Sequence, residues 1–72
     1  MTDVSSREWI AAFARALGVP PPSEEEVEQL LALAGLAAHA SERTAAPVSC
    51  WMAARAGVPP DQALAVARDL AV

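Results

Sequence analysis

The segment from His39 to Pro47 carries most of the side chains in this 72-residue chain that can take part in chemistry. His39 and Arg43 are four residues apart, which places them on one face of a helix, with Glu42 and Thr44 beside Arg43. A guanidinium binds phosphate or carboxylate through paired hydrogen bonds, and the N–H groups at the start of a following helix favour an anion. The pattern predicts a ligand- or partner-binding patch at His39, Glu42, Arg43 and Thr44.

The same residues also fit a purely structural role. Arg43 could cap the carboxyl end of the preceding helix or pair with Glu42, while His39 is simply solvated. Residue types and spacing do not separate this role from an anion site.

The sequence gives little indication of a catalytic site or a metal site. Cys50 and His39 are a nucleophile and a base, but no third group is evident to orient them, and a free cysteine is usually a small core residue. One histidine, one cysteine and scattered acids match no zinc-ligand spacing. We therefore expect a protein that is not an enzyme, with no catalytic residue, no metal site and no cofactor.

Length and charge set the broad class. Seventy-two residues allow one small domain, residues 1–72, and a formal net charge of −4 is unsuited to nucleic acid or to an anionic membrane. The two helices around Gly57-Val58-Pro59-Pro60 have the outline of a helix-turn-helix, but the exposed face of the second helix is close to neutral, which argues against DNA binding. No apolar run is long enough to span a membrane, the N-terminus lacks signal-peptide features, and a lone cysteine favours a reducing compartment. We expect a cytoplasmic protein.

Start and stop signals predict four helices. Ser5 and Ser23 each precede a glutamate by three residues, as in a capping box; Gly18 ends the first helix, and Pro47 fits the first position of the third. The expected fold is all-α: a compact four-helix domain with short Pro/Gly connections and helices at about 5–17, 24–41, 47–56 and 60–71.

Apolar side chains indicate which helix faces are covered. In the first helix they form one stripe (Trp9, Ile10, Phe13, Leu17), and in the last helix four residues are predicted to face the core (Ala63, Val66, Ala67, Leu70). The third helix is nearly apolar all round, so we expect it to be buried.

The second helix has an unusually wide apolar face, so it is either central in the fold or shared with a partner such as a second copy. Three residues are predicted to lie at an interface: Leu33, Leu36 and Trp51. Trp9 and Trp51 fit either core packing or a role as partner anchors, since tryptophan is enriched in interface hot spots.

Several segments resemble the small bacterial domain-of-unknown-function family 6457, over roughly Ser6 to Val72. They are Trp9-Ile10, Leu30–Ala34, Ala38-His39 and Glu42–Val48, and the most distinctive part is His39 through Val48, with its Ala-His, Arg and Ala-Pro. Members of that family occur alone, or beside or fused behind nucleotidyltransferases that attach guanosine monophosphate to molybdopterin. The resemblance implies a small accessory or interaction module for such a guanylyltransferase or a molybdoenzyme maturation factor. A binder of a phosphorylated pterin or nucleotide at His39 and Arg43, and a purely structural homodimer, are the alternatives.

Overall fold

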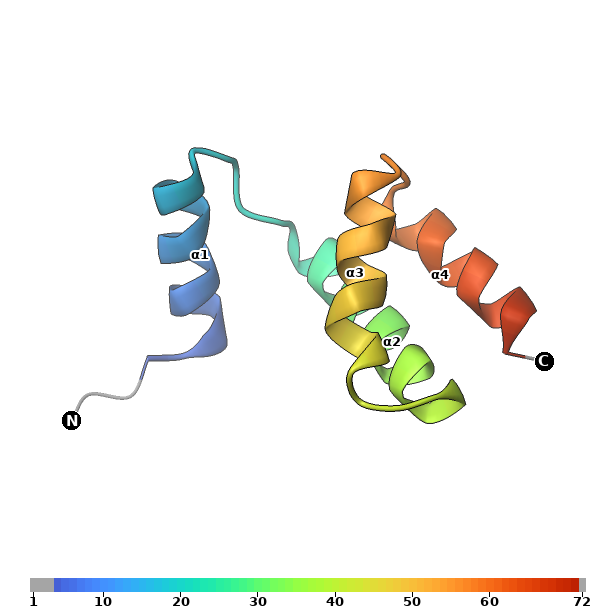
Figure 1. The fold of residues 1–72 in the computed structure, drawn as a ribbon. Helices are drawn as coiled ribbons and strands as arrows, with labels where there is room; N and C mark the ends of the chain where they lie inside the picture. The colour runs from blue at the N-terminus through green and yellow to red at the C-terminus, as the bar shows by residue number, and fades with distance from the viewer. Residues whose placement is uncertain (1–3, 72) are drawn as a thin grey trace.

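A computed structural model describes residues 4–71 as four α-helices joined by short connections (Figure 1). They are α1 (Ser6–Leu17), α2 (Glu24–Ala40), α3 (Ala45–Arg55) and α4 (Pro60–Leu70). The described residues contain no strand, so the predicted all-α, four-helix fold is confirmed.

The first two helices begin at the predicted capping boxes. The Ser5 hydroxyl accepts a hydrogen bond from the Glu8 N–H at 3.1 Å, and the Ser23 hydroxyl accepts one from the Glu26 N–H at 3.0 Å. Each glutamate carboxylate in turn accepts from the backbone N–H of its serine. Gly18 ends α1 in the left-handed conformation, at φ 74°, which a residue without a Cβ adopts at little cost.

The predicted start of the third helix is wrong by two residues. Helix α3 begins at Ala45, so Pro47 lies at its third position and not at its first. The N–H groups of Ala45 and Ala46 donate to the carbonyls of Glu42 and Arg43 in the preceding turn, at 2.9 and 3.1 Å. Proline is tolerated here because no N–H in the first turn has an intrahelical partner to lose.

Helix α2 is the central element, since it packs against both α3 and α4. Leu33 of α2 is 3% exposed and forms the core with Ala63 and Leu64 of α4. Partly buried side chains complete this core: Leu36, Cys50, Ala53, Val58 and Ala67. The chain therefore has one small core, built by α2–α4.

Helix α1 stands apart from that core (Figure 1). The linker 18–23, which has prolines at three successive positions, leads from α1 to α2. An exposed ion pair at 2.6 Å joins the Arg7 side chain near the start of α1 to the Glu24 side chain at the start of α2. The Cα radius of gyration is 13.1 Å, against about 11 Å for a compact chain of this length. The molecule is correspondingly elongated, with extents of 41 × 27 × 18 Å.

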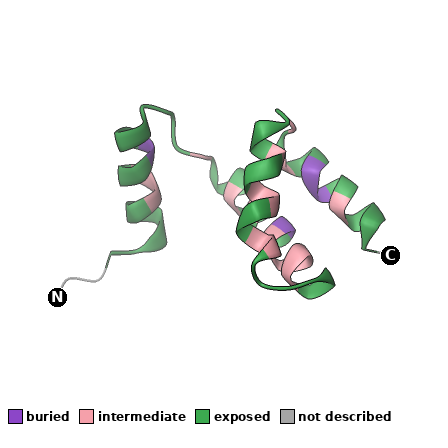
Figure 2. Cartoon of the chain, viewed as in Figure 1, coloured by how far each residue is buried: buried purple, intermediate pink, exposed green. Residues whose placement is uncertain are grey.

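Two burial predictions are wrong. Helix α3 has no buried residue, because among the described residues it packs closely on α2 alone and α1 does not close over its other side (Figure 2). In α4, Val66 and Leu70 are exposed, and Leu64 lies inward in their place. The helix is turned so that Ala63, Leu64 and Ala67 face α2.

Candidate functional site

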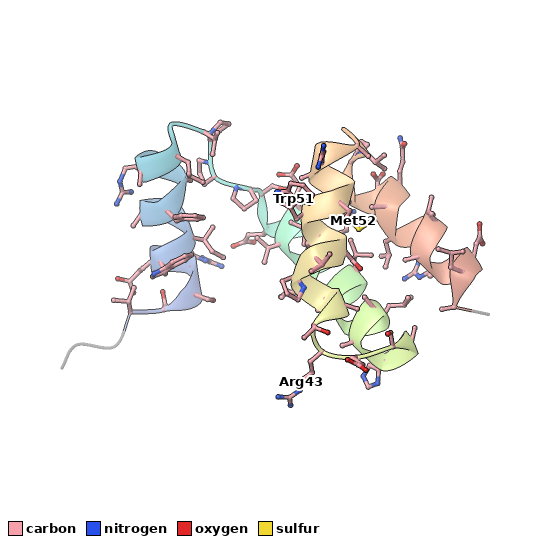
Figure 3. The ribbon with its side chains drawn as sticks, in the orientation of Figure 1. Arg43, Trp51 and Met52 are labelled. Carbon is pink, nitrogen blue, oxygen red and sulfur yellow. The ribbon has the colours of Figure 1, made fainter. Side chains whose placement is uncertain are left out.

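The predicted patch lies in and beside the turn between α2 and α3. His39, Glu42, Arg43 and Thr44 are all exposed, and Arg43 extends away from the helices (Figure 3). Within residues 4–71, Arg43 makes neither an ion pair with Glu42 nor a side-chain hydrogen bond to the end of α2. Two of the first α3 donors are already bonded to turn carbonyls. The patch is thus an open surface, and its Arg43 guanidinium has no hydrogen-bond or ion-pair partner among the described residues.

The Cys50 thiol faces the backbone of α2. Its Sγ lies 3.9 Å from the carbonyl oxygen of Leu30, to which it donates a weak hydrogen bond. Burial raises the pKa of the Cys50 thiol, which disfavours the nucleophilic thiolate. No hydrogen bond joins Cys50 to His39 in the described part of the chain.

Trp51 and Met52 are directed to different sides of α3, about 100° apart around its axis. Trp51 is directed toward the side of α1 and Met52 toward α4 (Figure 3). The Arg55 guanidinium lies 5.0 Å from the centroid of the Trp51 ring, a cation–π contact. Of the three predicted interface residues, Leu33 is buried within the chain, Leu36 is partly buried and Trp51 is 59% exposed.

The outer surface of α1 carries an apolar stripe, which we call the α1 ridge: Trp9, Phe13 and Leu17. These three side chains are between 49% and 60% exposed. They follow one another at four-residue spacing, which keeps them on one helix face. The sequence predicts this stripe, but the structure leaves it uncovered.

A second apolar feature, the α3–α4 groove, runs between α3 and α4 over α2 and encloses about 290 Å³. Its exposed lining includes Met52, Val66 and Leu70, the last 83% exposed. The remaining lining residues are small or lie deeper: Leu33, Ala37, Ser49, Ala53, Ala56, Val58, Ala63 and Ala67. Sequence reasoning missed this groove because it placed Val66 and Leu70 in the core.

A wider cleft of about 470 Å³ separates the N-terminal half of α1 from the start of α2. The Arg7–Glu24 ion pair lies on its wall, together with Ile10, Pro22 and Val27. Because both ionic side chains are about four-fifths exposed, this pair contributes little to stability.

Residues 4–71 hold neither a cluster of metal ligands nor a membrane-spanning helix. No three of the His, Cys, Asp and Glu side chains there are grouped closely enough to hold a metal ion. None of the four helices combines the length and the apolar character needed to cross a bilayer.

A family model described as "Domain of unknown function (DUF6457)" matches residues 1–72. The chain belongs to this family. The match to DUF6457 spans α1 as well as α2–α4, so the α1 ridge and the α3–α4 groove both lie within the family region. Neither a curated protein nor a solved structure matches the chain.

Proposed function

We propose that this protein is a non-catalytic helical module that acts by binding to another protein surface. The observation that carries the proposal is the accessible surface area of 5743 Å². A folded monomer of 7.5 kDa is expected to expose about 4,200 Å². The excess of about 1,500 Å² is larger than the ~800 Å² that each partner contributes to a standard interface.

The surface of the chain carries many large apolar side chains. Besides the α1 ridge, more than half of the surface of Val48, Trp51, Met52 and Leu70 is exposed. Large contiguous apolar patches are uncommon on soluble monomers and mark interaction sites, and the α1 ridge places three large apolar side chains next to one another on one helix face. It supports a binding module in preference to a free-standing enzyme.

The non-catalytic part of the proposal is supported by the environment of Cys50. Its thiol is directed at a backbone carbonyl and has a raised pKa, which is the environment of an inert structural cysteine. His39, the only histidine, lies exposed in the last turn of α2.

For the partner, we propose a molybdenum-cofactor guanylyltransferase or a molybdoenzyme maturation factor in the cytoplasm. The support for this partner is the family resemblance alone, since members occur beside or fused to such enzymes. Trp51 is the proposed anchor, because it is a large, exposed side chain whose ring is held in place by Arg55.

Calorimetric titration of the purified chain into the guanylyltransferase of the same organism tests this proposal. We expect saturable binding that Trp51→Glu weakens at least about 30-fold, the range of an interface hot spot. Gln62→Glu adds the same charge at an exposed polar position on α4 and is expected to bind like the wild type. Absence of binding by the wild type, or equal binding by both variants, contradicts the proposal.

A second candidate function is the binding of a phosphorylated pterin or nucleotide at His39 and Arg43. One observation favours it: the Arg43 guanidinium is exposed and has no intrachain partner among residues 4–71. Arginine forms strong paired hydrogen bonds with phosphate, so an exposed guanidinium whose N–H groups have no partner is suited to that ligand.

A further inference from the structure

This chain carries a protruding apolar ridge and a separate apolar groove. We infer that two copies associate by exchanging α1, so that the α1 ridge of each copy lies in the α3–α4 groove of the other. The inference deepens the proposed function, because it rests on the same exposed surface and names one partner for it, a second copy of the chain.

The chain exposes a large surface for its mass. The chain exposes about 1,500 Å² more than a compact monomer of its mass, and a stable interface requires ~800 Å² from each partner. The exchange covers the α1 ridge and the α3–α4 groove together, and it leaves Trp51, which is directed toward the side of α1 and away from the groove, for the partner enzyme (Figure 3).

The two features match in length and in chemistry. The α1 ridge runs from Trp9 to Leu17, about 12 Å along the helix axis. The groove follows α4 from Ala63 to Leu70, about 10 Å. Its floor is made mainly of alanine and its rim of Met52, Val66 and Leu70, a shape that admits large side chains between small ones.

The ridge and the groove of a single chain lie far apart. Helix α3 stands between α1 and α4 (Figure 1), and the groove lies between α3 and α4. Pro20–Pro22 fix three successive φ angles in the linker and stiffen it, so α1 is held out from its own chain. A second copy meets the ridge without bending this linker.

Charge favours the same pairing by a small amount. Helix α1 contains Arg7, Glu8 and Arg15, a net charge of +1, whereas α4 contains Asp61, Arg68 and Asp69, a net charge of −1. These groups are exposed, so their contribution is small and is screened by salt. We therefore expect association to persist at high ionic strength.

Exchange makes a two-fold symmetric dimer with two identical ridge–groove contacts. Sedimentation equilibrium on the full chain is expected to give twice the 7.5 kDa chain mass at micromolar concentration. Phe13→Asp places a charge in the middle of the α1 ridge, and Val66→Asp places one on the rim of the α3–α4 groove. We expect each alone to raise the dissociation constant at least about 30-fold. Leu31→Asp, at an exposed position on α2 outside both features, is the control and should remain dimeric.

Mixing the two variants separates exchange from other modes of dimerisation. A heterodimer of Phe13→Asp with Val66→Asp retains one intact ridge–groove contact, whereas each homodimer retains none. Restored association in the mixture is therefore the expected result. A mixture that stays monomeric, or loss of the dimer in Leu31→Asp, overturns the exchange.

A measurement on the wild-type chain avoids dependence on how the variants fold. In a sample of labelled and unlabelled chains, isotope-filtered NMR is expected to show contacts from the Phe13 ring to the Met52 and Val66 methyl groups of the other copy. A monomeric wild type, or contacts only within one chain, overturns the exchange. If a monomeric wild-type chain still binds the guanylyltransferase, the exchange is wrong and the proposed function stands. If the wild type forms the exchanged dimer but does not bind the guanylyltransferase, the exchange stands and the proposed partner is wrong.

Discussion

The rings of Trp9 and Phe13 stack on α1 with their centroids 4.9 Å apart and their planes inclined by 28°. The two residues are one helical turn apart, so each ring orders the other without help from α2, α3 or α4. An ordered aromatic pair on an uncovered helix face loses little side-chain entropy on binding. This pair is therefore well suited to anchor a contact with another molecule.

The small core depends most on Leu33. Leu33→Ala is expected to lower the free energy of unfolding by about 2–4 kcal/mol, because it removes the most buried large side chain between α2 and α4. Urea denaturation followed by circular dichroism measures the change. Leu31→Ala is the matched control on the exposed side of α2 and should change the stability by less than about 0.5 kcal/mol.

Gly35 lies in the middle of α2, and apart from its chain neighbours and the backbone of α2 itself no atom lies within 4 Å of the position that a Cβ would take. Gly35→Ala is expected to raise the free energy of unfolding by about 0.5–1 kcal/mol, since alanine loses less backbone entropy in a helix. Gly18→Ala should instead destabilise α1, because the φ of 74° at the end of the helix strains any residue with a Cβ. A loss of stability in Gly35→Ala would show that this face of α2 is covered.

The Cys50 thiol is expected to react slowly with iodoacetamide at pH 8. Burial raises its pKa, so less thiolate is present than in an unstructured peptide. Alkylation should accelerate in urea to the rate of free cysteine. A rate in the folded chain equal to that of free cysteine would contradict the packing of α3 on α2.

The same shift makes stability depend on pH. The folded chain holds the Cys50 proton more tightly than the unfolded chain, so this stabilisation is complete below the unfolded pKa of about 8.5. It is lost as the pH rises through the higher folded pKa. Urea midpoints measured from pH 7 to 10 should therefore fall more steeply for the wild type than for Cys50→Ala.

Arg43 is expected to be dispensable for folding. Its side chain is exposed and makes no hydrogen bond or ion pair with another described residue, and alanine keeps the backbone carbonyl that Ala46 uses, so Arg43→Ala should change the free energy of unfolding by less than about 0.5 kcal/mol. If the patch binds nucleotide or phosphate, the same variant abolishes that binding in equilibrium dialysis. A stability loss above about 1.5 kcal/mol would instead assign Arg43 a structural role.

Local signals predict the helices of this chain well. Ser5, Ser23 and Gly18 act through hydrogen bonds and dihedral angles within a few residues, so their roles are readable from sequence. Pro47 is less informative, because proline is tolerated anywhere in the first turn and does not fix the first helical residue.

Burial is harder to predict, because it depends on which helices meet. The apolar side chains of α1 and α3 predict that these helix faces are covered, but no other helix of the described chain packs over them. Val66 and Leu70 follow the spacing of a core face as well as Ala63 and Leu64 do, so the rotation of α4 is decided by its packing on Leu33. The α3–α4 groove follows from that rotation and has no signal of its own in the sequence.

Acrylamide quenching of tryptophan fluorescence tests most directly whether the exposed apolar surface is a binding surface. Trp51→Phe reports Trp9 alone, and Trp9→Phe reports Trp51 alone. We predict that the quenching constant of Trp9 falls when the chain is concentrated, and that of Trp51 falls when the guanylyltransferase is added. Unchanged quenching of both residues under both conditions would contradict the assignment of this protein as an interaction module.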